Sequence, residues 1–281
     1  MKVVSVINFK GGVGKTTLTA NLGAYAASQG YRVLLVDLDS STNLTFSFIP
    51  VDEWEAEYSK TQTLKEFFGA VLNGHEAPTL ERLVIQKTFD KVKIDFLSSH
   101  LDLMGIDSNL SAWLTDIDLS SRASDYMKLV SCLRRAINNF DNLYDLVLLD
   151  CRNDFNFMAK CALYASDYYI VPTQLAALDV KGIHQLTKFI NEYREKCDKH
   201  RDTLKNSTYE PLSLRMLGVV PMKVKIWRNT ELVSTEQSFL DDLIEDYHVF
   251  QGEYHVFQFV RDNPKLFGEM AKIKNNRVVL P

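Results

Sequence analysis

Short hydrophobic runs alternate with longer amphipathic segments along the whole chain. Six runs rich in aliphatic and β-branched residues are predicted to be β-strands: Val3–Ile7, Val33–Val36, Val92–Leu97, Leu146–Leu149, Tyr168–Val171 and Met216–Val219. Their near-continuous apolarity is typical of strands covered on both faces, as in a parallel sheet. Strands alternating with helices therefore predict an α/β fold with a mostly parallel central sheet flanked by helices.

Two of the amphipathic segments place apolar residues at helical spacing. The first helix is expected to stop at Gly30, and the second is expected to begin with Asp179 as its N-cap. The apolar faces consist of Leu18, Leu22, Tyr25 and Ala26 in the first helix and Val180, Ile183, Leu186, Ile190 and Tyr193 in the second.

The domain organisation is predicted to be simple. The chain has 281 residues and contains no Pro/Gly/Ser-rich linker, repeat or low-complexity tract, so we expect a single domain over residues 1–281. Residues 42–90 mix acidic, aromatic and turn residues without a clear period. We expect this segment to be an irregular insertion of short helices at the edge of the sheet.

A glycine-rich loop joins the first predicted strand to the first predicted helix, with the sequence KGGVGKTT from Lys10 to Thr17. Glycines let the backbone approach an anion closely, and consecutive N–H groups at a helix N-terminus then face the phosphates. Lys15 is expected to reach the β and γ oxygens, and the Thr16 hydroxyl to contact Mg²⁺. The predicted nucleotide-binding residues are Gly11, Gly12, Val13, Gly14, Lys15, Thr16 and Thr17.

The loop departs from the common phosphate-binding pattern, because Phe9 occupies the place of its first glycine. It matches instead the variant with a second lysine, Lys10, at its start. A glycine turn with surface lysines is the plain alternative, but the position between a strand and a helix favours nucleotide binding.

Carboxylates close two of the predicted strands: Asp37 and Asp39 follow one, and Asp150 follows another. The carboxyl ends of parallel strands meet at one edge of a sheet, where a ligand binds. We therefore expect Thr16, Asp37 and Asp150 to hold Mg²⁺. A strand-end aspartate that caps a helix is an equally good interpretation for each one taken alone.

These motifs occur in the order typical of the ParA/MinD family of deviant Walker-A ATPases, which the chain resembles from residue 2 to about residue 270. Lys10 matches the signature lysine of that family, Asp37-Leu-Asp39 the element after the second strand, and Asp150 the Walker-B aspartate. Weaker similarities follow in order at residues 94–103, 165–174, 179–183 and 228–230.

The resemblance implies a P-loop NTPase fold, with ATP and Mg²⁺ as ligands, and a sandwich dimer of two ATP-bound subunits. Lys10 would reach the phosphates of the partner subunit, and Asp39 would position the attacking water. The implied catalytic residues are thus Lys10, Lys15 and Asp39. Hydrolysis in this family is weak and is stimulated by a partner protein, so that ATP shifts the protein towards the dimer and hydrolysis releases it.

Two segments depart from the family pattern. Ser40-Ser41 and Arg152-Asn153 stand where the family usually has Pro-Gln and Pro-Pro. Proline fixes φ and stiffens a segment, so these departures leave the switch behaviour and the hydrolysis rate open. Arg152 is expected either to contact phosphate or the partner subunit, or to cap the next helix from the surface.

The net charge of −4 conceals an uneven distribution. Residues 37–120 contain 15 acidic and 6 basic residues, whereas residues 181–228 contain 11 basic and 5 acidic ones. In the resembling family, basic residues late in the chain bind DNA without sequence preference. The candidate DNA-binding residues are Lys223, Lys225, Arg228, Lys272 and Lys274, with a solvated helix face as the alternative for any single one.

The cysteines and the apolar runs indicate the cellular compartment of the protein. Cys132, Cys151, Cys161 and Cys197 form no CxxC pair, and no leader or 18-residue apolar stretch is found, so we expect a cytoplasmic, nucleoid-associated protein without a membrane partner. The expected function is ATP-driven partition or positioning of a plasmid, chromosome or large protein assembly with an adaptor or centromere-binding protein. The alternatives are a metabolic ligase of the dethiobiotin-synthetase type and a MinD-like regulator not bound to DNA.

Overall fold

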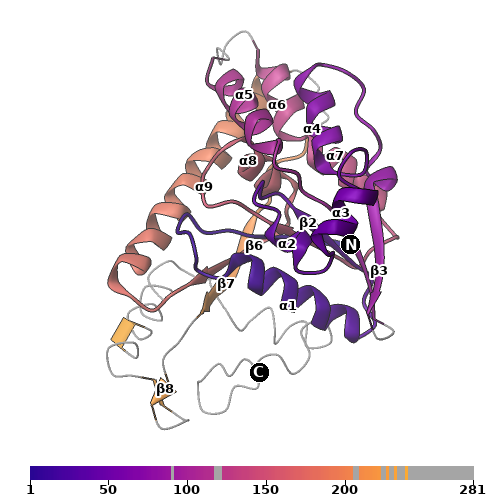
Figure 1. The fold of residues 1–281 in the computed structure, drawn as a ribbon. Helices are drawn as coiled ribbons and strands as arrows, with labels where there is room; N and C mark the ends of the chain where they lie inside the picture. Colours follow the sequence, from indigo (N-terminus) through magenta and orange to yellow (C-terminus); the bar gives the residue numbers. More distant parts are fainter. Residues whose placement is uncertain are drawn as a thin grey trace.

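A central seven-stranded sheet lies between two layers of helices in the computed structural model, which describes residues 1–89, 92–116, 122–204, 209–222, 226–227, 231–232 and 238–239 (Figure 1). The strand order is β3-β4-β2-β5-β1-β6-β7. All neighbouring strands pair in parallel except β3, which is antiparallel to β4 at the edge. The strands are β1 Lys2–Val6, β2 Val33–Asp37, β3 Val84–Phe89, β4 Val92–Leu97, β5 Leu146–Asp150, β6 Tyr168–Thr173 and β7 Arg215–Pro221.

The sheet confirms the predicted fold class and all six predicted strands, whose ends shift by up to two residues. The central strands β2 and β5 are buried along their whole length, as their continuous apolarity predicts. Strand β3 was not predicted, because its sequence VIQKTF has no apolar run longer than two residues; only Ile85 of the strand is buried. An edge strand exposed on one side lacks the apolar run on which the other predictions relied. A separate short pair is formed by β8 Ile226–Trp227 and β9 Glu231–Leu232.

The helices divide between the two faces of the sheet according to the core they help to form. Helices α1 Lys15–Ser28, α2 Asn43–Phe46 and α3 Val51–Glu57 contribute to a core on one face, with Leu18, Leu44 and Trp54 among its members. On the other face lie α4 Leu64–Leu72, α5 Leu103–Asp116, α6 Ala123–Val130, α7 Cys132–Ile137, α8 Phe157–Ala165 and α9 Ala177–Thr203. Two 3₁₀ turns, Leu80–Leu83 and Asn138–Phe140, complete the described elements.

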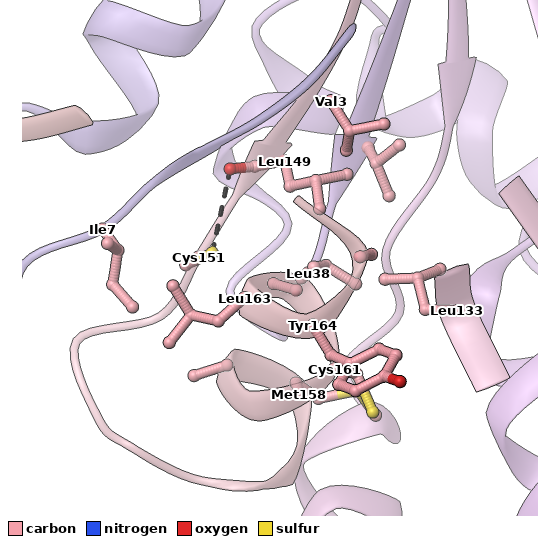
Figure 2. Packing of buried hydrophobic residues seen from close by; sticks show 14 of the residues in the cluster. Val3, Ile7, Leu38, Leu133, Leu149, Cys151, Met158, Cys161, Leu163 and Tyr164 are labelled. Carbon is pink, nitrogen blue, oxygen red and sulfur yellow. Dashed lines mark hydrogen bonds between the residues drawn. The ribbon is translucent and has the colours of Figure 1, made fainter. Parts of the chain in front are cut away.

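Figure 2 shows part of the larger core, in which α8 packs beneath the central strands. Met158, Cys161 and Leu163 of α8 lie among Val3 of β1 and Leu149 of β5, all nearly inaccessible to solvent. Burial of this kind stabilises the folded chain by about 25 cal/mol for each Å² of apolar surface removed from water. The four cysteines are buried free thiols, so they contribute packing.

The two predicted helix boundaries have different outcomes. Gly30 lies just beyond α1 with φ +88°, a left-handed conformation that favours glycine and ends the helix as expected. The prediction of Asp179 as the N-cap of α9 is wrong, because the N-cap is Ala176 and Asp179 lies inside the first turn. Its carboxylate binds a lysine of the phosphate loop instead, as described below.

Segment 42–90 contains α2, α3, α4, the first 3₁₀ turn and β3. In the described part of the chain, no helix is both long enough and apolar enough to cross a membrane. The candidate DNA-binding residues Lys223, Lys225, Arg228, Lys272 and Lys274 lie outside the described residues.

Candidate nucleotide site

The glycine-rich loop connects the carboxyl end of β1 to the first turn of α1. Gly12 and Gly14 have φ values of +71° and +94°, in the left-handed region that glycine adopts without strain. Gly14 is the N-cap of α1 and has no side chain to accept from the first helical N–H groups, which leaves them to an anion. A Cβ at Gly14 would lie 2.9 Å from Cε of Met222, so the loop is also closely packed.

Lys15 folds back across the loop from the first residue of α1. Its Nζ donates to the backbone carbonyls of Asn8 and Lys10, at 3.1 and 3.2 Å, and the residue is only 8% exposed. Burial lowers the pKa of Lys15, and the nearby Asp150 carboxylate partly offsets that effect. A buried ammonium that contacts only carbonyl dipoles would be strongly stabilised by an anionic ligand. This is the property expected of a lysine that binds phosphate.

Two carboxylates end the neighbouring strands β2 and β5, where Asp37 and Asp150 are direct register partners, and Asp150 contacts the loop. The Thr16 hydroxyl donates to Asp150 at 2.7 Å, and the Thr19 hydroxyl lies 3.4 Å from the other carboxylate oxygen. The Asp37 carboxylate accepts from the backbone N–H and the hydroxyl of Thr45, at 2.8 and 2.7 Å.

Burial raises the pKa of both Asp37 and Asp150, and Asp150 raises that of Asp37 further. A cation bound between these carboxylates and the phosphates would stabilise the ionised form of both groups. The hydroxyl of Thr16 and these carboxylates are hard oxygen ligands, which suit Mg²⁺. Mg²⁺ is usually bound by one or two carboxylates together with substrate phosphates.

Asp39 lies two residues beyond the end of β2, in a turn at the same edge of the sheet. One of its carboxylate oxygens accepts from the Ser41 N–H at 3.0 Å, and its carbonyl accepts from the Ser99 hydroxyl at 2.7 Å. The charge of Asp39 contributes to the pKa values of Lys15 and Asp150, so the three groups share one electrostatic environment.

Lys10 stands at the outer side of the loop and is bound by α9. Its Nζ lies 2.7 Å from one oxygen of Asp179 and 3.0 Å from the other. The lysine side chain is 47% exposed, whereas that of Asp179 is 2% exposed. The acidic residue is also favoured by its place in the first turn of α9.

The structure thus gathers Lys10, the loop, Lys15, Thr16, Asp37, Asp39 and Asp150 at one edge of the sheet. Sequence reasoning missed the residues that hold them: Asn8, Thr19, Thr45, Ser99 and Asp179. Thr19 had a local signal, since it lies one helical turn after Thr16. Ser99 and Asp179 lie in two of the weaker family similarities, which do not specify their contacts, and Asn8 and Thr45 belong to no motif.

Residues 1–204 match the AAA_31 family, described as an AAA domain. The chain is 30% identical over 185 residues to the sporulation initiation inhibitor protein Soj of Bacillus subtilis and 29% identical over 194 residues to the chromosome partitioning protein ParA of Caulobacter vibrioides. These alignments cover 66% and 69% of this chain and 63% and 64% of the relatives. The chain therefore spans less than two thirds of the length of either relative.

Solved structures of P-loop ATPases have a fold similar to that of this chain. Cobyrinic acid a,c-diamide synthase from Mycobacterium smegmatis, with bound ADP and magnesium, is similar with a TM-score of 0.64 and 25% identity, over 88% of this chain and 82% of that one. The structure of pnob8 ParA is similar with a TM-score of 0.61 over 95% and 79% of the two chains, and at 21% identity it supports the fold alone. The ADP and magnesium of the synthase agree with the predicted ligands ATP and Mg²⁺. From its motifs, its fold and these matches, the chain belongs to the ParA/MinD family of P-loop ATPases.

Proposed function

We propose that this protein is a Mg²⁺-dependent ATPase of the ParA type, which partitions or positions a plasmid, a chromosome or a large protein assembly. ATP-bound subunits pair, the pair binds nucleoid DNA without sequence preference, and an adaptor or centromere-binding protein stimulates a weak hydrolysis that releases it. The partition role is supported by the name of the relative in Caulobacter vibrioides.

Each residue of the site has a part in this proposal. The loop from Gly11 to Thr17 and the Lys15 ammonium would hold the phosphates of ATP, as the left-handed glycines and the desolvated lysine favour. Thr16 and Asp150 would hold Mg²⁺, with Asp37 acting directly or through water. The bound ion would neutralise charge on the phosphate oxygens. Asp39 would orient the attacking water.

The observation that carries the proposal is the position of Lys10. Its side chain is half exposed at the outer side of the phosphate loop, and its ammonium binds α9 through Asp179. A lysine in this place can leave its own subunit and stabilise charge on the phosphates of another.

Two lysine variants test the proposal. Lys15→Ala should abolish ATP binding, whereas Lys10→Ala should bind ATP with an affinity close to that of the wild type but fail to dimerise. Light scattering after gel filtration with ATP and Mg²⁺ measures the dimer, and retention on duplex DNA at low salt measures its binding. A Lys10→Ala variant that still dimerises and hydrolyses ATP normally would refute the switch.

A metabolic ligase remains the second candidate, because the similarity to cobyrinic acid a,c-diamide synthase is also substantial. Such an enzyme would turn over ATP only with its small substrate and would not need Lys10. Basal ATP hydrolysis by the purified protein, stimulated by DNA and a partner, favours the ParA-type switch. ATP-dependent dimers that never retain DNA would instead indicate a regulator of the MinD type.

A further inference from the structure

The two segments that depart from the family pattern contact each other. Arg152, two residues beyond β5, donates from one guanidinium nitrogen to the Ser40 hydroxyl at 2.7 Å. Ser40 lies three residues beyond the end of β2, and the two strands are neighbours in the sheet. Ser40 and Arg152, which stand where the family usually has prolines, therefore form a hydrogen bond although they lie 112 residues apart in the sequence.

This hydrogen bond helps to hold the turn that contains Asp39. On one side of the turn, the Ser99 hydroxyl beyond β4 donates to the Asp39 carbonyl at 2.7 Å. On the other side, Arg152 beyond β5 binds Ser40. Strand β2 lies between β4 and β5 in the sheet, so the turn that follows it is fixed from both neighbouring strands.

The guanidinium is well placed for this task. The Arg152 side chain is 20% exposed and Ser40 is 3% exposed, so water competes little for their hydrogen bond. A second nitrogen of the guanidinium lies 3.5 Å from the Asp154 carboxylate, which keeps the planar group oriented. Hydrogen bonds to a charged group contribute more than neutral ones.

We infer that Arg152 is a positioning residue for ATP hydrolysis, which acts through Ser40 to hold the turn of Asp39 at the edge of the sheet where ATP is proposed to bind. A charged hydrogen bond here does the work that proline stiffness does in relatives with Pro-Gln and Pro-Pro. Arg152 also lies two residues from Asp150, whose carboxylate accepts from Thr16 of the phosphate loop. The hydrogen bond between Arg152 and Ser40 therefore connects the turn that contains Asp39 with the residues proposed to hold Mg²⁺. The inference rests on the proposed ATPase function.

Two variants that break the contact from opposite ends provide the test. Arg152→Ala and Ser40→Ala should each lower kcat for ATP hydrolysis by about tenfold to a hundredfold, the effect of misplacing a reacting group by about 1 Å. The KM for ATP should change by less than about twofold. The double variant should be no slower than either single one, because both remove the same contact. Arg152→Lys, which keeps a cationic donor, should recover part of the rate.

A second measurement does not depend on hydrolysis. Amide hydrogen exchange in residues 38–46 should accelerate in Arg152→Ala and in Ser40→Ala, since the turn is then held less firmly. The matched control is Arg201→Ala at the far end of α9. Arg201 has the same side-chain exposure, 20%, and a comparable contact with Asp198 at 2.6 Å, so its substitution should leave both measurements unchanged.

The possible failures are distinguishable. A wild-type protein without ATPase activity would overturn the proposed function itself. An active wild type in which Ser40→Ala keeps a normal kcat, while Arg152→Ala raises KM, would mean that the arginine contacts the nucleotide directly. Additive losses in the double variant, or unchanged exchange in residues 38–46, would also overturn the positioning role.

Discussion

The carboxylates of Asp37 and Asp150 are the most strongly perturbed groups of the site at the scale of single residues. They are 1% and 0% exposed and sit side by side on adjacent strands, yet no cationic side chain forms an ion pair with either in the described part of the chain. Their hydrogen bonds come from Thr45, Thr16 and backbone N–H groups, which stabilise the charged forms only in part. This pair therefore costs stability whenever both groups are ionised and no metal is bound.

The stability of the nucleotide-free protein should consequently fall as the pH rises. Burial raises the folded-state pKa of Asp37, so the folded protein binds its proton more tightly than the unfolded chain does. The free energy of unfolding should thus be larger at low pH, and it should decrease as the pH rises from the unfolded-state pKa to the folded-state pKa. Asp37→Asn cannot ionise, and in EDTA at pH 8.5, above the folded-state pKa that burial raises to about 8, it should be more stable than the wild type by at least about 1 kcal/mol.

Urea unfolding at several pH values measures this difference. The advantage of Asp37→Asn should shrink towards pH 6, where the wild-type carboxyl is protonated in the folded protein, and it should also shrink when Mg²⁺ and ATP are added. The half-buried His100 and the buried His200, whose pKa values burial lowers, change the stability of both proteins equally, so the comparison cancels them. A difference that is the same at every pH would refute the assignment.

At the scale of elements, the first turn of α9 holds the lysine that the proposed dimer needs. Asp179 is buried and Lys10 is its cationic partner, so moving Lys10 to another subunit would leave a buried carboxylate without its counter-ion. The contact between α9 and the phosphate loop therefore favours the monomer. ATP binding has to supply the free energy that breaks it.

Asp179→Asn should accordingly make the dimer easier to form. The amide keeps the shape of the side chain but removes the charge, so the ATP concentration for half-maximal dimerisation should fall a few-fold. Light scattering over an ATP titration measures it, and Asp198→Asn near the other end of α9 is the matched control. A weaker dimer in Asp179→Asn would contradict this and would mean that each Asp179 receives the Lys10 of the partner subunit in a symmetric exchange.

The elements also mark how far the sequence could predict the structure. Central strands such as β2 and β5 are continuous apolar runs, so their existence and their terminal aspartates could be predicted. The edge strand β3 could not, because its sequence VIQKTF has neither a continuous apolar run nor an alternation of apolar and polar residues. The contacts of Lys10 with Asp179 and of Arg152 with Ser40 join segments more than 100 residues apart, and no local pattern specifies such partners.

At the scale of the whole molecule, charge is segregated along the chain rather than balanced locally. The acidic segment 37–120 includes two of the site carboxylates, and the basic excess lies in residues 181–228. In the proposed function, dimerisation would double every basic patch, so a chain with a net charge of −4 would still bind DNA in its ATP-bound dimer.

DNA affinity should therefore depend steeply on salt and on the late lysines. For Lys223→Ala with Lys225→Ala, the slope of log K against log salt should become shallower by about 0.9 for each phosphate that the variant no longer neutralises. Fluorescence anisotropy with ATP at several salt concentrations measures the slope. Lys60→Ala, an exposed lysine in the acidic segment, serves as the control. An unchanged slope in the double variant would place the DNA-binding surface elsewhere.

Met222 packs against Gly14 of the phosphate loop, and this contact bears on how ATP binding would affect DNA binding in the proposed function. Met222 follows β7, is anchored to β6 through a 2.7 Å hydrogen bond from its N–H to the Thr173 carbonyl, and rests its side chain on the phosphate loop. Lys223 is the next residue in the chain. If the loop binds ATP as proposed, a movement of the loop would reach Met222 by direct side-chain contact, one residue before the candidate DNA-binding residue Lys223 in the sequence.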